Sequence, residues 1–314
     1  MVNNKEEISA AVLAGCNLHI LMYLANRARE KYYGEKVSFC SIINARSGRC
    51  REDCRFCAQS GHYPEAAGRV PQYGLKAPDQ ILAAAREAER AGAARFSIVT
   101  SGRAVEDEKD WGRIYQTIGL LKKELSLAVD ASLGFLDKEH AGNLKKAGLD
   151  RYHHNLETAP AFFPRICTTH TFSDRWETVE VVKESGLELC CGVLMGMGES
   201  WEDRLQVALL LSKINPDSIP LNFLHPVPGT PLGEKNYLSP LETLRIIALF
   251  RIILPDKDIR ICGGREYNLR QLQSWMFYAG ASGVMTGNYL TTKGQSPQQD
   301  QELVRDLGLC REQY

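Results

Sequence analysis

The sequence predicts an α/β fold, a single (β/α)8 barrel of the TIM type with an N-terminal helical extension, and three observations support this. Eight short runs of apolar or alternating residues recur along the chain. Amphipathic stretches separate these runs; two of them, DQILAAAREAERAG and DRWETVEVVKESG, begin near Asp and end at Gly, as capped helices do. No segment rich in Pro, Gly or Ser divides the chain, so we expect one domain over residues 1–314.

The expected elements follow one another in a regular order. Residues 1–35 are expected to hold an N-terminal helix, whose pattern covers about 6–30, residues 36–290 the barrel, and residues 291–314 a C-terminal helical segment. In such a barrel the loops that follow the strands form the active-site face. The expected strands are 37–43, 94–100, 127–133, 151–157, 188–194, 218–224, 258–264 and 282–288.

Composition and charge exclude several classes of function. The chain has 38 basic and 38 acidic residues, so its net charge of +0 predicts no general attraction to nucleic acid or to an anionic membrane. No run of about 18 apolar residues indicates a transmembrane helix. The acidic N-terminus lacks the basic start of a secretion signal, so a cytoplasmic location is expected. There, the ten cysteines are expected to be metal ligands or buried apolar residues rather than disulfides.

The loop after the first predicted strand carries three closely spaced cysteines. The segment reads GRCREDCRFCAQSG (48–61) and contains Cys50, Cys54 and Cys57. Thiolates suit zinc or iron–sulfur clusters, and zinc usually draws four ligands from two paired motifs. No second pair follows, and three thiolates can hold three irons of a [4Fe–4S] cluster while the fourth iron stays open. A zinc knuckle or a chance grouping is the alternative.

The C-x3-C-x2-C spacing, with Phe56 before the last cysteine, resembles the radical S-adenosylmethionine (SAM) superfamily. Over about residues 35–310 the chain resembles its biotin synthase family, on the motifs INARSGRCREDCRFCAQS, YHHNLET, GMGES, PLNFLHPVPGTPL, GGRE and GASGVMTGNYLTT. The resemblance implies a [4Fe–4S] cluster whose open iron binds SAM. It also implies sulfur insertion into dethiobiotin from an auxiliary iron–sulfur cluster, a flavodoxin or ferredoxin as electron donor, and a homodimer.

The resemblance assigns roles to individual residues. Asn155 and Asn222 match residues that contact dethiobiotin, and Glu157 stands where the family commonly has Asp. His153 replaces a usual asparagine and shares one strand face with Asn155 and Glu157. The residues that match SAM-binding positions are Phe56, Glu157, Arg175, Gly196 and Glu199.

The auxiliary-cluster ligands depart from the family pattern of three cysteines and one arginine. The matching positions here hold Ser97, Asp130, Cys190 and Arg260, so two thiolates are missing. Oxygen ligands are harder and fit iron–sulfur clusters poorly.

Two other cysteines compensate for this loss. Cys262 follows Arg260 by two residues and points to the same side of its strand, and Cys40 lies in the first strand. Cys40, Cys190 and Cys262 are therefore expected to converge on the barrel interior and to hold a four-iron cluster with an extra sulfide. A [2Fe–2S] cluster with oxygen ligands is one alternative, and Cys40 and Cys262 as small buried apolar residues are another. Cys191 is expected to face outward, and Cys167, in a loop near the SAM face, is a further candidate whose role stays open.

Two rival functions stay open. The first is another radical SAM reaction on the same scaffold, a methylornithine-type mutase or a hydrogenase-cofactor maturase, which needs no donated sulfur. The second is an iron–sulfur carrier without catalysis. The paired asparagines and the segment GNYLTT favour sulfur insertion.

Overall fold

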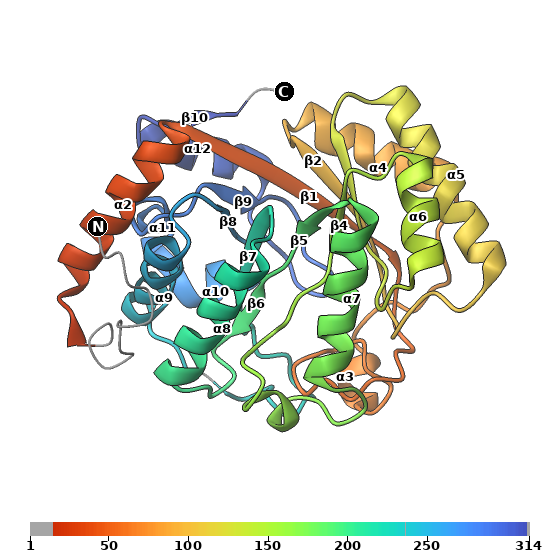
Figure 1. The fold of residues 1–314 in the computed structure, drawn as a ribbon, viewed down its shortest axis with the longest axis horizontal. Coiled ribbons are helices and arrows are strands. Elements are labelled where there is room, and N and C mark those ends of the chain that lie inside the picture. Colours follow the sequence, from red (N-terminus) through yellow and green to blue (C-terminus); the bar gives the residue numbers. More distant parts are fainter. Residues whose placement is uncertain (1–14, 236, 313–314) are drawn as a thin grey trace.

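A closed parallel barrel lies at the centre of the computed structural model, which describes residues 15–235 and 237–312 (Figure 1). β1 pairs with β2 on one side and with β9 on the other, which closes the sheet on itself. β5 and β6 share one place in the barrel between β4 and β7. The strands are β1 (Lys36–Arg46), β2 (Arg95–Thr100), β3 (Ala128–Ser132), β4 (Arg151–His153), β5 (Glu188–Cys190), β6 (Val193–Met195), β7 (Ser218–Phe223), β8 (Asp258–Ile261) and β9 (Gly283–Met285).

Helices surround the barrel, and several begin and end at the residues that the sequence indicates. Thr171 and Asp174 form a capping box at the start of α7, which ends at Gly186 with a left-handed φ of 73°. Asp137 caps α6 in the same way through the backbone N–H of His140. The helices are α2 (Leu18–Tyr33), α3 (Pro64–Ala67), α4 (Pro78–Arg90), α5 (Glu108–Glu124), α6 (Lys138–Ala147), α7 (Phe172–Ser185), α8 (Trp201–Ile214), α9 (Pro240–Ile253), α10 (Arg265–Leu269), α11 (Trp275–Tyr278) and α12 (Pro297–Asp306).

The first described helix and the C-terminal segment both adjoin the start of β1. The expected N-terminal helix is α2 in its described part, which starts after the Asn17 cap and packs against α9; residues 6–14 of the expected helix lie outside the described residues. The C-terminal segment contains α12 and also a short strand that was not expected, β10 (Cys310–Arg311), which pairs with Lys36 and Val37 of β1. No helix in the described part of the chain is long and apolar enough to cross a membrane.

Side chains along each strand point alternately outward, toward the helices, and inward, toward the barrel interior. Phe39, Ile98 and Ile219 are fully buried and pack outward against the helices, within the main apolar core. Cys191 belongs to this outer layer, as its parity predicts. The neighbouring positions, Cys40 and Cys190 among them, face the barrel interior and line a cavity.

Several predicted strands are shorter than expected: the seventh ends at Ile261 and the eighth at Met285, and the fourth and fifth change course beside the site. The fourth ends at His153 instead of residue 157, because the backbone turns until Glu157 has a left-handed φ of 68°. The fifth is interrupted between Cys190 and Val193, where a Cβ on Gly192 would lie 1.9 Å from the backbone oxygen of Pro220. These breaks place irregular backbone at the carboxyl end of the barrel, beside the site.

Candidate active site

Two cavities lie at the carboxyl end of the barrel. The inner cavity, of about 360 Å³, is in the barrel interior, and the outer one, of about 200 Å³, lies beside the cysteine loop. Phe56, His153, Asn155 and Glu157 line both cavities, so the two spaces adjoin. The site therefore has a deep compartment and a mouth.

The cysteine loop brings its three thiols to the outer cavity. Cys50, Cys54 and Cys57 all line it. The loop folds back on itself, because Cys50 N–H donates to the carbonyl oxygen of Gln59 and its own carbonyl accepts from Gly61 N–H at 2.7 Å. Burial raises the pKa of Cys50 and raises that of Cys57 to about 11, so a bound metal would displace protons there. Three adjacent thiols of this kind suit an iron–sulfur cluster.

A second loop, residues 166–170, fixes the middle of the cysteine loop. Asp53 accepts hydrogen bonds from the backbone N–H of Thr168 at 2.8 Å and of Thr169 at 3.2 Å. Although burial opposes it, the bonds from Thr168 and Thr169 hold the pKa of Asp53 well below its usual range. Arg55 N–H donates to the carbonyl oxygen of Ile166 at 2.9 Å. The two loops therefore form one rigid unit around Cys54.

The second loop also places Cys167 and His170 beside Cys54. The Sγ atoms of Cys54 and Cys167 lie 3.8 Å apart, and Cys167 Sγ lies 3.2 Å from His170 Nδ1. Contact with Cys54, followed by His170 and Thr169, lowers the pKa of Cys167 to about 4 against the effect of burial. The sequence makes Cys167 a candidate with an open role, and His170 was missed. The Cys-x-x-His spacing in RICTTHTF is the signal that could have found the pair.

Glu157 and Arg175 lie together at the wall of the outer cavity. Arg175 Nη1 donates to the Asn155 carbonyl oxygen at 3.0 Å and lies 3.5 Å from Glu157 Oε1. Burial raises the pKa of Glu157, and the charge of Arg175 opposes this shift. Arg175 Nε is buried with no hydrogen-bond partner. This pair offers both a cation and a carboxylate to a polar cosubstrate.

Gly196 and Glu199 line neither cavity. The Glu199 carboxylate accepts from the backbone N–H of Gly196 and Met197, at 2.9 and 2.8 Å, and from Arg204 Nε at 2.9 Å. Its side chain is completely buried, and these bonds hold the turn that follows β6 against α8. The two residues thus shape the rim, and the structure does not bring them to the cavities.

The inner cavity contains a second group of thiols. Cys40, Cys190 and Cys262 line it from β1, β5 and the end of β8. Contact with Cys262 and the charge of Arg260 lower the pKa of Cys40 to about 7, although burial opposes them. Burial raises the pKa of Cys190 to about 12, and Cys190 Sγ lies 3.3 Å from His153 Nδ1.

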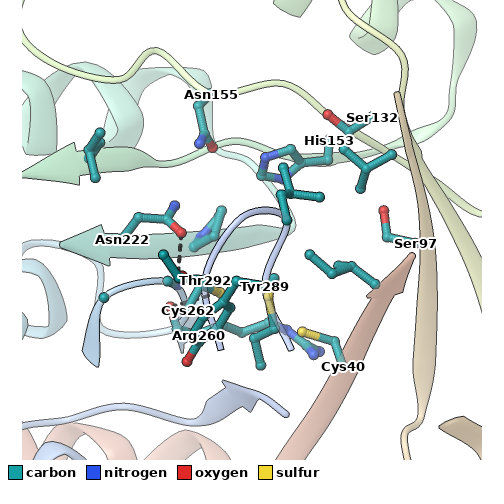
Figure 2. Close-up of a pocket in the computed structure, with 18 of the residues that line it drawn as sticks. Cys40, Ser97, Ser132, His153, Asn155, Asn222, Arg260, Cys262, Tyr289 and Thr292 are labelled. Atoms are coloured by element: carbon teal, nitrogen blue, oxygen red, sulfur yellow. Dashed lines mark hydrogen bonds between the residues drawn. The ribbon is translucent and has the colours of Figure 1, made fainter. Parts of the chain in front are cut away.

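Arg260 lies beside these thiols with one unused donor. Figure 2 shows its guanidinium group next to Cys40 and close to Cys262. Nε donates to Asp258 Oδ2 at 2.6 Å and Nη2 to Ser38 Oγ at 2.8 Å, whereas Nη1 is buried without a partner. A buried unsatisfied donor is costly, so this side of the cavity suits an anionic group.

The oxygen groups at the family's cluster positions differ in availability. Ser97 and Asp130 both line the inner cavity. Both Asp130 oxygens accept from Arg95, with Nη2 to Oδ1 at 2.7 Å and Nε to Oδ2 at 3.0 Å, and both side chains are nearly buried. Asp130 is therefore already neutralised by an ion pair.

Asn155 and Asn222 line the part of the inner cavity toward its mouth (Figure 2). Asn222 accepts from Gly263 N–H at 3.0 Å and donates to the Val193 carbonyl oxygen at 3.2 Å. Tyr289 and Thr292, from the segment after β9, line the same cavity. Each asparagine amide keeps hydrogen-bonding capacity for a ligand.

Comparisons with known proteins give the same relatives over nearly the whole chain. Residues 45–211 match the Radical SAM superfamily, and residues 220–310 match the Biotin and Thiamin Synthesis associated domain. Biotin synthase of Geobacter sulfurreducens is 50% identical over 95% of this chain and 90% of its own length. Biotin synthase of Geobacter metallireducens is 48% identical over 98% of this chain and 92% of its own length.

Solved structures with the same fold have much lower identity. A methylornithine synthase matches with a TM-score of 0.82 at 20% identity, over 97% of this chain and 93% of that one. The FeFe-hydrogenase maturase HydG from Carboxydothermus hydrogenoformans matches with a TM-score of 0.83 at 18% identity, over 98% and 77%. At such identities the likeness shows the fold alone.

Proposed function

The chain belongs to the biotin synthase family of radical SAM enzymes, and on that premise we propose that it converts dethiobiotin to biotin by radical sulfur insertion. Family membership implies a [4Fe–4S] cluster and SAM. One observation carries the proposal: a group of three thiols lies at the mouth of a cavity whose depth holds a second group of three. A substrate bound between the two groups of thiols would have the source of the radical on one side and the source of the inserted sulfur on the other.

The outer cavity fits the cluster and SAM. Cys50, Cys54 and Cys57 would hold three irons, and the group bound there would supply the radical that removes hydrogen from the substrate. Arg175, with its unpartnered Nε, would position the carboxylate or the ribose oxygens of SAM. Glu157, buried and ion-paired with Arg175, would accept from the ribose hydroxyls.

The inner cavity fits dethiobiotin. The substrate has a polar ureido ring and an aliphatic chain, which need a few directed hydrogen bonds in an otherwise apolar space. Asn155 and Asn222 offer amide groups for the ring, and Leu194 and Val227 offer apolar surface. The depth of the cavity would keep water away from the carbon radicals.

For the auxiliary site we propose a four-iron cluster with an extra sulfide, held by Cys40, Cys190 and Cys262. The unpartnered Nη1 of Arg260 would donate a charge-assisted hydrogen bond to this anionic group, which would supply the inserted sulfur. An oxygen-ligated [2Fe–2S] cluster is the weaker alternative, because Asp130 would have to leave its ion pair with Arg95 to bind iron.

Iron counting after anaerobic reconstitution tests this assignment. Cys190→Ala and Cys262→Ala should each lose about four irons per chain, keep SAM cleavage, and form no biotin. Ser97→Ala and Asp130→Ala are matched controls on the same cavity wall, and they should keep their iron. Loss of only two irons in the cysteine variants, or loss of iron in the controls, would support the oxygen-ligated alternative.

Product analysis tests the reaction itself. With SAM, reductant and dethiobiotin, the reconstituted enzyme should form biotin, with about two 5′-deoxyadenosines for each product because two C–H bonds are broken. If dethiobiotin does not couple to SAM cleavage and another small molecule does, the mutase or maturase alternative is right. A flavodoxin or ferredoxin donor and a homodimer are part of the proposal, and reduction assays and light scattering test them.

A further inference from the structure

Cys167 and His170, which have no role in the assignments above, form with Cys54 a compact group of metal-ligand side chains. We propose that these three residues bind a single tetrahedral divalent cation, Zn²⁺ or Fe²⁺, in chains that carry no cluster in the cysteine loop. The proposal rests on the proposed function in one respect, since it takes Cys54 to be a ligand of the [4Fe–4S] cluster. Metal at this site and a complete cluster therefore exclude each other.

The distances fit a single metal ion. The candidate ligand atoms of the three residues all lie within 4.8 Å of one another, and the two Sγ atoms are 3.8 Å apart. A tetrahedral ion with metal–sulfur bonds of about 2.3 Å holds two sulfurs about 3.8 Å apart. Cysteines bound to different irons of a cubane lie farther apart, so Cys167 does not extend the cluster's own ligand set.

The donor types also fit Zn²⁺ or Fe²⁺. Two thiolates and one imidazole are soft to borderline ligands that these ions prefer. The fourth position is left to a water molecule, because Asp53 Oδ1 already accepts from the N–H groups of Thr168 and Thr169. His170 is buried, and its Nε2 has no hydrogen-bond partner.

The surrounding backbone holds this group in place without a metal. The Asp53 carboxylate accepts hydrogen bonds from the N–H groups of Thr168 and Thr169, and Arg55 N–H donates to the carbonyl oxygen of Ile166. Cys54 lies between Asp53 and Arg55 in the sequence, and Cys167 lies between Ile166 and Thr168. Because the ligands are preorganised, little conformational entropy opposes metal binding.

Occupation of this site would have a defined consequence for cluster assembly. Metal binding releases thiol protons and engages Cys54, so incoming iron and sulfide must displace the ion before Cys54 can join the cluster. Excess Zn²⁺ should therefore slow reconstitution of the outer cluster through Cys167 and His170, two residues that the cluster itself does not use.

Cobalt titration of full-length, iron-free, reduced chain tests the site directly. The reference is the Cys50→Ala/Cys57→Ala double variant, which cannot hold the cluster but keeps the proposed ligands. It should bind one tetrahedral Co²⁺ with a sulfur-to-cobalt charge-transfer band, and Zn²⁺ should displace it. Adding Cys167→Ser or His170→Gln should weaken this binding at least about tenfold. The inner thiols are the same in all these chains, so any cobalt that they bind does not affect the difference between the reference and its variants.

X-ray absorption of the zinc-loaded reference keeps the test decisive if a variant folds poorly. The spectrum should fit two sulfur ligands with nitrogen and oxygen ligands, whereas three sulfurs would place the metal on the inner thiols and overturn the proposal. Equal cobalt affinity with and without Cys167 would overturn it as well. Failure of the wild-type chain to cleave SAM would contradict the proposed function but would leave the cobalt result unaffected, so the two failures are distinguishable.

Discussion

The ion pair between Arg265 and Asp300 is a sharp test of how α12 is fixed to the barrel. Arg265 Nη2 donates to both Asp300 oxygens, at 2.6 and 2.8 Å, and the exposed fractions of the two side chains are 0% and 1%. Arg265 Nε also donates to Tyr289 OH at 3.2 Å, and Tyr289 lines the inner cavity. Asp300→Asn removes the buried negative charge that Nη2 contacts and leaves the guanidinium with Glu266, 3.4 Å from Nε, as its remaining carboxylate.

The expected loss follows from this burial. Removing one partner of a buried ion pair costs about 3–5 kcal/mol in the free energy of unfolding. Unfolding entropy is about 2 cal/mol/K per residue, which for 314 residues amounts to about 0.65 kcal/mol/K. The melting temperature should therefore fall by about 5–8 °C.

Thermal unfolding of the iron-free chain, followed by circular dichroism, measures this shift. Asp306→Asn is the matched control, because Asp306 is exposed at the end of the same helix and should change stability by less than about 0.5 kcal/mol. The double variant Arg265→Met/Asp300→Leu should recover part of the loss, since no buried charge remains. An Asp300→Asn chain that melts together with wild type would refute the argument.

Four further outcomes are expected. Cys54→Ala should abolish formation of 5′-deoxyadenosine with dithionite as reductant, and wild-type yields would rule out its assignment as a cluster ligand. Gly264→Ala should cost more than about 3 kcal/mol, because φ is +79° and the new Cβ would lie 1.9 Å from a backbone oxygen. Gly119→Ala, in α5 with nothing within 4 Å, should instead stabilise by up to about 1 kcal/mol, as chemical denaturation will show. Asp130→Asn should lower the free energy of unfolding by about 3 kcal/mol, because the ion pair of Arg95 with Asp130 is lost, but the variant should keep its iron. Loss of iron would mean that Asp130 is a ligand.

Hydrophobic periodicity was sufficient to predict the barrel. Each of the predicted strands has a counterpart in the described residues, because buried parallel strands need apolar runs that local sequence reveals. The strand breaks at residues 154–157 and 191–192 were not predictable, since they depend on contacts between strands, such as Leu156 N–H with the Gly192 carbonyl oxygen. The same limit applies to β10, which is only two residues long and is defined by its pairing with β1.

The candidate site shows which signals are local and which are not. Strand parity predicted that Cys40, Cys190 and Cys262 face the interior, and they line one cavity. Their role as cluster ligands stays a prediction. Resemblance brought Glu199 into the SAM site, but only the structure reveals that Arg204 and two backbone N–H groups occupy its carboxylate. Whether a carboxylate is already hydrogen-bonded in this way depends on tertiary contacts that no motif encodes.

Barrel closure has a consequence for the time at which iron can be delivered. Cys40 and Cys262 come together only when β9 (Gly283–Met285) lies between β8 and β1. The inner thiols therefore do not form a group until β9 has been made and the barrel has closed. The ligands of the cysteine loop, by contrast, lie within eight residues of one another and are complete early in synthesis. Any metal binding by the inner thiols as a group thus requires a closed barrel, whereas the thiols of the cysteine loop are brought together by one short segment.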